Sequence, residues 1–166
     1  RRIGYVPQEA FLFSESIEEN ILFATNDPAP GNAVRAAEDA EVDENIREFP
    51  EGYKTVVGER GITLSGGQKQ RISIARALAA APRILLLDDC LSAVDTETEE
   101  HILRNMNEIT SQCTSLLVSH RVSSVKHADH ILVLENGAVC ESGTHEQLIK
   151  KEGAYFELHE KQLREE

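Results

Sequence analysis

The chain has 166 residues, of which 40% are hydrophobic and 28% are charged, and its formal net charge is −12. This length corresponds to about one domain, and the composition fits a globular protein with a core. The acidic balance counts against nucleic-acid binding, which normally uses a basic patch. No apolar run approaches the length of a membrane span, so we expect any membrane association to depend on a partner. The three cysteines, Cys90, Cys113 and Cys140, lack metal-site spacing and are expected to be free thiols.

The first half of the chain predicts one short strand followed by helices. Pro7 ends the strand, and Ser16 with Glu19 three residues later forms a capping box that begins a helix. Turn residues separate the next segments, and the stretch from Pro50 to Gly61 is expected to be irregular. The predicted elements are a strand at 3–6, a helix from 16, one or two amphipathic helices at 32–49, and a long helix from Ser65 to about Ala80.

The second half predicts alternating strands and helices. The apolar runs 83–87 and 114–118 have the pattern of strands that are buried on both faces. Thr96 and Glu99 form a second possible capping box, and Glu135–Gly137 predicts a hairpin turn. The predicted elements are strands at 83–87 and 114–118, a helix at 96–109, a short helix at 121–126, a hairpin at 130–143, and helices at 144–151 and 154–165.

Strand–helix–strand alternation with apolar strands predicts an α/β fold with a mostly parallel sheet. Ligands of such sheets bind at the carboxyl ends of the strands. Asp88, Asp89, His120 and Gln8 all follow predicted strands. Two adjacent carboxylates repel each other, and a hydrated Mg²⁺ would relieve that repulsion, because this ion needs only one or two carboxylates beside phosphates. Each residue alone would be consistent with a plain polar strand end.

The stretch LSGGQKQR, residues 64–71, is the sharpest feature of the sequence. Ser65, Gly66, Gly67 and Gln68 stand at the start of a long predicted helix. The glycines allow a ligand to approach the backbone, and the free N–H groups and the helix dipole favour an anion. On Ser-Gly-Gly alone, an ordinary helix start would be the better interpretation. The polar residues that follow and the downstream carboxylates favour an anion site.

Together these pieces resemble the nucleotide-binding domain of ATP-binding-cassette (ABC) proteins. LSGGQKQR is similar to the family signature, ILLLD to the Walker B strand, and SAVD at 92–95 to the D-loop. His120 matches the switch histidine. The stretches YVPQEAFLFSESIEENI and TVVGERG, at residues 5–21 and 55–61, resemble the Q-loop and X-loop of exporters. The resemblance covers essentially the whole chain.

The resemblance implies a partial RecA-like sheet of the P-loop NTPase type with an inserted α-helical signature subdomain. It implies a Q-loop strand and loop at 1–13, the signature subdomain at 14–81, and the C-terminal part of the ATPase core at 82–166. Two cassettes of this family enclose two ATP molecules, head to tail. Catalysis is then mostly positioning and charge neutralisation.

The resemblance also implies a role for each site residue. Gln8, Asp88, Asp89 and His120 would face the ATP of their own cassette, with Asp88 and Gln8 toward Mg²⁺ and with Asp89 and His120 as catalytic residues. The signature would contact the γ-phosphate held by a partner cassette, and Asp95 would carry signals across the interface. The signature residues concerned are Ser65, Gly66, Gly67 and Gln68.

The chain departs from the family pattern in two ways. No GxxxxGK[ST] motif occurs, so we expect a fragment that begins inside a domain and by itself binds ATP weakly and is inactive. Asp89 stands where the family normally has Glu, which is longer by one methylene. This resembles heterodimeric exporters, in which one chain has a weakened base and an intact signature.

The leading hypothesis is an ATPase subunit of an ABC exporter at the cytoplasmic face of the cell membrane. Its expected partners are a second, non-identical cassette and transmembrane domains reached through the Q-loop and X-loop. One alternative is a soluble ABC ATPase that acts on nucleic acid or ribosomes, against which the exporter-like stretches and the acidic charge count. Another is an α/β binding module without nucleotide, which leaves the SGGQ, Asp–Asp and His spacing unexplained.

Overall fold

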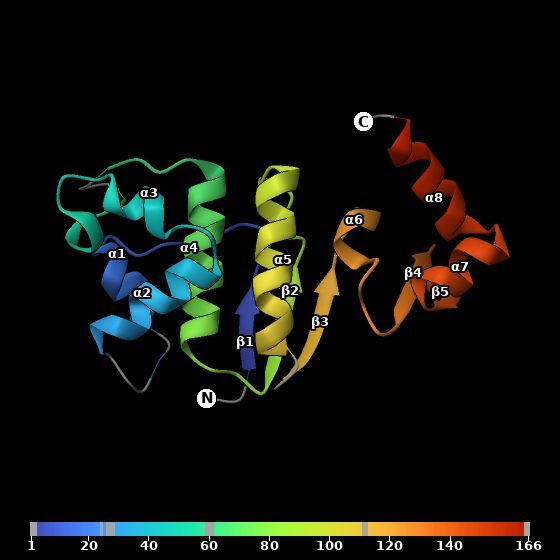
Figure 1. The fold of residues 1–166 in the computed structure, drawn as a ribbon, viewed down its shortest axis with the longest axis horizontal. Coiled ribbons are helices and arrows are strands. Elements are labelled where there is room, and N and C mark those ends of the chain that lie inside the picture. The colour runs from blue at the N-terminus through green and yellow to red at the C-terminus, as the bar shows by residue number, and fades with distance from the viewer. Residues whose placement is uncertain (1–2, 24, 26–28, 59–61, 111–112, 165–166) are drawn as a thin grey trace. The chain divides into compact units, whose positions relative to one another are not determined.

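The computed structural model describes residues 3–23, 25, 29–58, 62–110 and 113–164, with the side chains of Pro30, Thr96 and residues 107–110 left out of the description (Figure 1). The chain divides into two compact units, residues 1–118 and residues 119–166. Each unit has its own hydrophobic core. Within the described residues, no helix combines the length and the apolarity needed to cross a bilayer.

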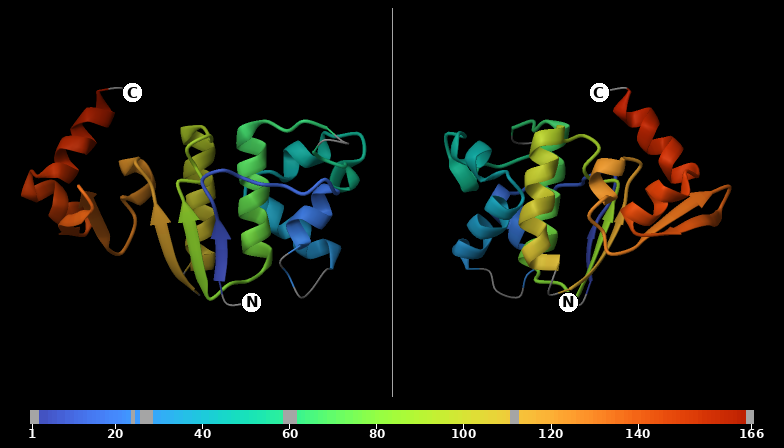
Figure 2. Two further views of the ribbon diagram at one scale, coloured as in Figure 1. Left: turned by 180° about the vertical axis from the view of Figure 1, so that it is seen from behind. Right: turned by 45° about the vertical axis from the view of Figure 1, so that its right-hand side comes forward.

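A three-stranded parallel sheet organises the first unit. Its strands are β1 (Ile3–Val6), β2 (Ile84–Asp88) and β3 (Thr114–Val118), in the order β1-β2-β3. Helices α4 (Gly66–Ala79) and α5 (Thr96–Thr110) lie on one face of this sheet (Figure 2). The parallel α/β prediction is confirmed. The carboxyl ends of all three strands meet at one edge, and the N-termini of α4 and α5 lie at the same edge (Figure 1).

The prediction that the strands are buried on both faces is wrong. Leu85 and Leu87 are buried against the helices, whereas Ile84 is 38% exposed on the opposite side of β2. In β3, Leu116 and Val118 are 56% and 50% exposed. The reason is that successive side chains of a strand point to opposite faces, and among the described residues of this unit α4 and α5 cover only one of them.

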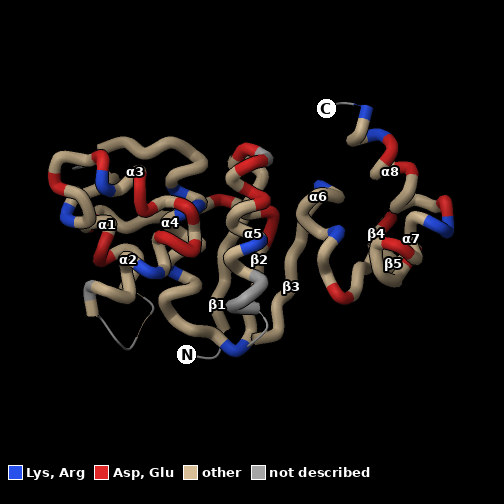
Figure 3. The backbone as a smooth tube through the Cα atoms, in the orientation of Figure 1, with Lys and Arg blue, Asp and Glu red and all other residues tan. Residues whose placement is uncertain are grey.

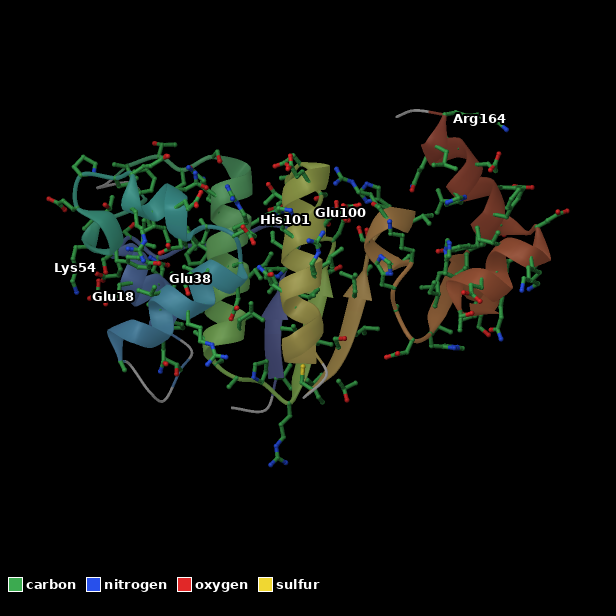
Figure 4. All side chains as sticks on the ribbon, in the orientation of Figure 1. Glu18, Glu38, Lys54, Glu100, His101 and Arg164 are labelled. Atoms are coloured by element: carbon green, nitrogen blue, oxygen red, sulfur yellow. The ribbon has the colours of Figure 1, made fainter. Side chains whose placement is uncertain are left out.

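A group of helices lies between β1 and β2 in the sequence. Ser16 and Glu19 form the predicted capping box, with both reciprocal bonds present. Lys54 forms an ion pair with Glu18, and the two side chains lie together in Figure 4. The elements are α1 (Ile17–Leu22), α2 (Pro30–Asp39), α3 (Asp43–Arg47) and a 3₁₀ turn, η1 (Gly52–Lys54), followed by α4.

The second unit contains an antiparallel hairpin and three helices. The hairpin turn is at Asn136 and Gly137, whose φ angles of 51° and 79° are those of a type I′ turn, so this prediction is confirmed. The core of the second unit contains Val122, Ile131 and Leu148. The elements are α6 (Val122–Val125), β4 (Ile131–Glu135), β5 (Ala138–Gly143), α7 (His145–Lys151) and α8 (Ala154–Leu163).

A buried carboxylate on β5 caps the N-terminus of helix α8. Glu141 accepts hydrogen bonds from the backbone N–H groups of Ala154 (3.1 Å) and Tyr155 (3.2 Å). It is 8% exposed, and Lys151 lies 3.8 Å away. A negative charge at a helix N-terminus is stabilised by the free N–H groups and the dipole. The cap therefore connects the hairpin to the last helix.

Candidate functional site

The carboxyl ends of β1 and β2 bring three of the predicted site residues together. The side-chain amide of Gln8 donates a hydrogen bond to Oδ2 of Asp89 at 3.3 Å. The Tyr5 hydroxyl donates to Oδ2 of Asp88, also at 3.3 Å. Desolvation and then the nearby Asp88 carboxylate raise the pKa of Tyr5 above its ordinary value. The two carboxylates thus have separate neutral donors, and Gln8 joins the ends of neighbouring strands.

The two acidic residues differ in backbone conformation. Asp88 is the last residue of β2, whereas Asp89 has a φ of 44°, in the left-handed region that aspartate tolerates better than most residues. The Asp89 N–H donates to the carbonyl of Val118 at 2.8 Å, and the Ser92 hydroxyl donates to the carbonyl of Asp89 at 2.9 Å. The turn after β2 is therefore fixed by hydrogen bonds to both the N–H and the carbonyl of Asp89.

The SGGQ stretch begins α4, as the sequence predicts. Ser65 is the N-cap, and its Oγ accepts from the Gln68 N–H at 3.2 Å while Gln68 Oε1 accepts from the Ser65 N–H at 3.0 Å. The first turn of α4 contains no acidic residue. Both capping bonds use acceptor oxygens, which leaves the Ser65 hydroxyl hydrogen and the Gln68 amide hydrogens to donate. This helix start has the positive character that an anion requires.

A hollow of about 410 Å³ lies between the start of α4 and the segment that precedes α5. Arg71 borders it and donates to the carbonyl of Glu41, and burial lowers the pKa of the Arg71 guanidinium. On the opposite side lies the SAVD segment. The residues around the hollow are Ser65, Gly66, Gly67, Arg71, Ala93, Val94 and Asp95. Four predicted site residues therefore border one space: the signature residues Ser65, Gly66 and Gly67, and Asp95.

Asp95 is the N-cap of α5. Its Oδ1 accepts from the Thr98 N–H at 2.9 Å, and this N–H, together with Arg71, holds the pKa of the carboxyl below its usual range. The predicted box with Thr96 as cap is wrong, because Thr96 is already the first helical residue and Asp95 is an equally good cap one position earlier. Figure 3 shows acidic residues gathered at this end of α5.

Gln70 connects the loop after β1 to the SAVD segment, a role that no motif in the sequence predicts. Its Nε2 donates to the carbonyl of Gln8 and its Oε1 accepts from the Ala93 N–H, both at 3.2 Å. The side chain is 6% exposed. The sequence offers no signal for this role, because the burial of Gln70 and both of its partners depend on how the helix packs.

His120 lies in the second unit, whereas the other predicted site residues lie in the first. It lies two residues after Val118, the last residue of β3, and its side chain is exposed. The carbonyl of His120 accepts from Nε2 of Gln162 at 2.7 Å, and Oε1 of Gln162 accepts from the Val122 N–H at 2.8 Å. Helix α8 thus fixes the backbone on which His120 stands.

The parallel fold and the polar residues at the carboxyl edge of its sheet are found together in a known class of protein. The chain superposes on the solved structure of a bacterial Atm1-family ABC exporter with ATP bound, with a TM-score of 0.91 and 41% sequence identity over 97% of this chain and 28% of the other. The α/β architecture with its parallel sheet is accordingly that of the ABC ATPases, a P-loop NTPase fold.

The sequence comparisons agree with the fold. The family described as ABC transporter matches residues 1–92. The chain is 48% identical over 160 residues to the probable multidrug resistance ABC transporter ATP-binding/permease protein YheI of Bacillus subtilis (strain 168), covering 96% of this chain and 27% of that protein. It is 45% identical over 164 residues to the ATP-dependent lipid A-core flippase of Idiomarina loihiensis, covering 98% and 28%.

A third relative is the mitochondrial potassium channel ATP-binding subunit of Mus musculus, which is 48% identical over 160 residues, with 96% of this chain and 22% of that protein covered. The chain belongs to the ABC transporter family. It spans about a quarter of the length of the curated relatives that it matches.

Proposed function

We propose that residues 1–166 form part of the ATP-hydrolysing cassette of an ABC exporter and power the efflux of a substrate. The observation that carries the proposal is the joining of Gln8 to Asp89, with Asp88 adjacent, at the carboxyl edge of the sheet. These residues occupy the Q-loop and Walker B positions of the family pattern. The relatives named as a multidrug resistance transporter and a lipid flippase support the exporter class.

Asp88 and Gln8 are the residues proposed to hold Mg²⁺. The fit is supported by chemistry and geometry, since hard oxygen donors suit this ion and the Tyr5 hydroxyl is bonded to Oδ2 of Asp88 rather than to Oδ1. When bound, Mg²⁺ would neutralise charge on the β- and γ-phosphates.

Asp89 is proposed as the general base that orients and deprotonates the attacking water. Its carboxylate is positioned by the Gln8 amide and by the turn held at Val118 and Ser92. His120, at the end of the next strand, is proposed to contact the γ-phosphate. The positioning of these groups, more than covalent chemistry, would supply the rate.

The SGGQ start of α4 is proposed to contact the γ-phosphate bound by a second cassette. The donors available there are the backbone N–H groups of Gly66 and Gly67, the Ser65 hydroxyl and the Gln68 amide, and the helix dipole adds to them. Asp95 is proposed to carry the state of one site to the other, and its place on the rim of the same hollow supports this.

The shorter Asp89 supports a finer proposal, that the partner cassette is a non-identical chain. Asp has about 1.5 Å less reach than Glu, and misplacement by about 1 Å can lower a rate on the order of 100-fold. The site of this chain would therefore turn over slowly, while its complete signature would serve the competent site of the partner. Each composite site would then combine residues of both chains.

The proposed location is the cytoplasmic face of the cell membrane, with transmembrane domains as partners. The Q-loop and X-loop stretches are the proposed contacts with them. Residues 59–61 of the X-loop lie outside the described residues. In its described part, the Val57 N–H donates to the carbonyl of Glu15 and the Ile17 N–H to that of Thr55, so that the X-loop stretch is hydrogen-bonded to the second half of the Q-loop stretch, residues 5–21.

The test is ATP hydrolysis by a complete exporter that carries this sequence, purified and reconstituted in lipid. Asp88→Asn should abolish Mg²⁺-dependent hydrolysis at the site of this chain and leave the melting temperature unchanged. Asp129→Asn, at an exposed position in the second unit, is the matched control and should keep the wild-type rate. Hydrolysis is measured in single turnover with the partner site inactivated, because the competent partner site would otherwise dominate the rate. Equal rates for wild type and Asp88→Asn in that measurement would contradict the proposal.

Residues 1–166 by themselves are proposed to bind MgATP weakly or not at all, and to be inactive, because the sequence contains no phosphate-cradling GxxxxGK[ST] motif. Titration calorimetry of this piece checks the statement, and micromolar binding would contradict it. The alternative function, a soluble ABC ATPase on nucleic acid or ribosomes, predicts stimulation of hydrolysis by RNA or DNA. A net charge of −12 counts against that outcome.

A further inference from the structure

Gln70 occupies a position that the family roles proposed above do not use. It lies on α4, five residues after Ser65, and its side chain points to the sheet side, where it is 6% exposed. A buried amide with an unmet donor or acceptor is destabilising, so both of its ends require partners. Here both partners are backbone groups of loops that lie far from Gln70 in the sequence.

The two hydrogen bonds of Gln70 reach the two loops of the candidate site. Its Nε2 donates to the carbonyl of Gln8, and its Oε1 accepts from the N–H of Ala93, each at 3.2 Å. The side chain of Gln8 in turn donates to Asp89 at 3.3 Å. The chain of contacts therefore runs from the SAVD segment through Gln70 and Gln8 to the proposed base.

The approach of α4 to the SAVD segment is close enough to make this contact specific. A β-carbon on Gly67 would lie 3.0 Å from the carbonyl oxygen of Ala93, so the N–H and carbonyl of Ala93 both face α4. A shorter side chain than glutamine at position 70 could not reach both loops. An apolar side chain of equal length could fill the space but would bond to neither.

We propose that Gln70 is a positioning residue that fixes the backbone of Gln8 and the turn at Ala93 to helix α4, and that it thereby connects the Gln8–Asp89 pair to the SGGQ helix start. This inference rests on the proposed function. In a two-cassette arrangement, Gln8 would serve the ATP site of its own chain and the SGGQ residues the opposite site, so Gln70 would connect the two sites within one chain.

Two substitutions distinguish the hydrogen bond of Gln70 to Gln8 from its hydrogen bond to Ala93. Gln70→Met keeps the length and removes both bonds. Gln70→Glu keeps an acceptor for the Ala93 N–H but places a carboxylate oxygen against the carbonyl of Gln8. Ser73→Ala is the matched control, because Ser73 is also buried, at 3% exposure, on the same helix, and the described hydrogen bonds include none from its side chain to either loop.

The first measurement is amide hydrogen exchange of the complete exporter without nucleotide, followed in peptides that contain Ala93. Gln70→Met should accelerate exchange at Ala93 about tenfold, because the N–H loses a bond worth about 1 kcal/mol or more. Gln70→Glu and Ser73→Ala should leave it at the wild-type rate. Unchanged exchange in Gln70→Met would overturn the proposal, whatever the ATPase activity.

The second measurement is hydrolysis by the same proteins with the ATP site of the partner cassette inactivated, so that only the site of Gln8 and Asp89 is followed. Gln70→Met and Gln70→Glu should lower kcat about tenfold and leave the KM for ATP within about twofold, since Gln70 touches no nucleotide and acts through orientation. In a Gln8→Ala background, Gln70→Glu should have no further effect. An equal loss in Ser73→Ala, or full additivity with Gln8→Ala, would overturn the proposal.

These outcomes are distinct from a failure of the proposed function. If the wild-type exporter hydrolyses no ATP, the proposed function fails and the exchange measurement still decides whether Gln70 holds Ala93. If the wild type hydrolyses ATP and both Gln70 variants match Ser73→Ala in exchange and in kcat, the inference about Gln70 fails alone.

Discussion

Gly67 approaches Ala93 so closely that a β-carbon at Gly67 would lie 3.0 Å from the Ala93 carbonyl oxygen. The neighbouring Gly66 has more room, because its β-carbon would have the Ala93 methyl as nearest neighbour at 3.8 Å. Two adjacent glycines in one helix turn therefore meet different constraints. At Gly67 the absence of a side chain is required by packing, and at Gly66 the helix would accept alanine.

We expect Gly67→Ala to be less stable than Gly66→Ala by about 1–2 kcal/mol. Alanine favours a helix over glycine by up to about 1 kcal/mol, a gain that both variants share. Only Gly67→Ala must also displace a backbone carbonyl, which costs energy of the kind seen for overpacking. Equilibrium urea unfolding of the two variants measures the difference directly. Equal midpoints would show that the segment at Ala93 moves away without cost.

Asp89→Glu should raise ATP turnover at the site of this chain in the complete exporter, roughly 10- to 100-fold. The added methylene extends the carboxylate toward a water that Asp89 reaches poorly. Glutamate tolerates the left-handed φ of 44° less well than aspartate, so we expect a loss of stability of up to about 1 kcal/mol. Single-turnover hydrolysis with the partner site inactivated is the measurement, and an unchanged rate would count against a shortened base.

The start of α8 offers a stability prediction in the second unit. Glu141→Ala should lower the free energy of unfolding by about 2 kcal/mol, because two backbone N–H groups and a helix dipole lose a buried carboxylate. Gly153→Ala should act in the same way, since its β-carbon would lie 1.8 Å from Oε1 of Glu141 and displace it.

The control for this pair is Glu157→Ala, an exposed glutamate on α8, which should change stability by less than about 0.5 kcal/mol. Adding Gly153→Ala to Glu141→Ala should have little further effect, because the carboxylate that it displaces is already gone. Fully additive losses in thermal unfolding would mean that the glycine is needed for another reason.

His145 makes the second unit sensitive to acid. Its Nδ1 lies 2.9 Å from the Tyr155 hydroxyl, its ring packs against His159, and Lys126 and His127 add positive charge, with Glu146 as the opposing charge. Burial and then His159 lower the pKa of His145 below its ordinary value. The unfolded chain therefore binds a proton at a higher pH than the folded chain does.

Because the unfolded state binds more protons there, stability falls as the pH drops below about 6.5. We expect the melting temperature to decrease between about pH 7.5 and pH 5.5, and to decrease less in His145→Gln. His101→Gln, on the exposed surface of α5 in the first unit, is the control and should follow the wild type (Figure 4). Identical pH profiles for wild type and His145→Gln would refute the assignment.

Local signals in the sequence predicted much of the fold. The Asn136–Gly137 turn and the Ser16–Glu19 box form as expected, because a positive φ and a reciprocal cap are properties of a few neighbouring residues. Burial of β2 and β3 was predicted wrongly, since an apolar run does not tell whether one face or both are covered. Which side of a strand is covered depends on where distant helices pack.

The candidate site also contains residues that the sequence predicted and one that it did not. Gln8 and Asp89 were predicted individually from the family pattern, and the structure adds that they contact each other. Gln70 was missed because its function depends on two backbone groups that are 62 and 23 residues away in the sequence. No periodicity or motif encodes such a contact, and the burial of Gln70 is itself a result of how α4 packs.

Cys90 follows Asp89 directly and is fully buried, and desolvation raises the pKa of its thiol to about 12. A thiol in that state stays protonated at neutral pH and resists maleimides and disulfide reagents, because only the thiolate attacks them. Cys140 is exposed on the hairpin and has no such protection. With Cys140 modified and the half-buried Cys113 replaced, Cys90 would be the remaining thiol, and its rate of labelling would report how often the chain opens beside the proposed base.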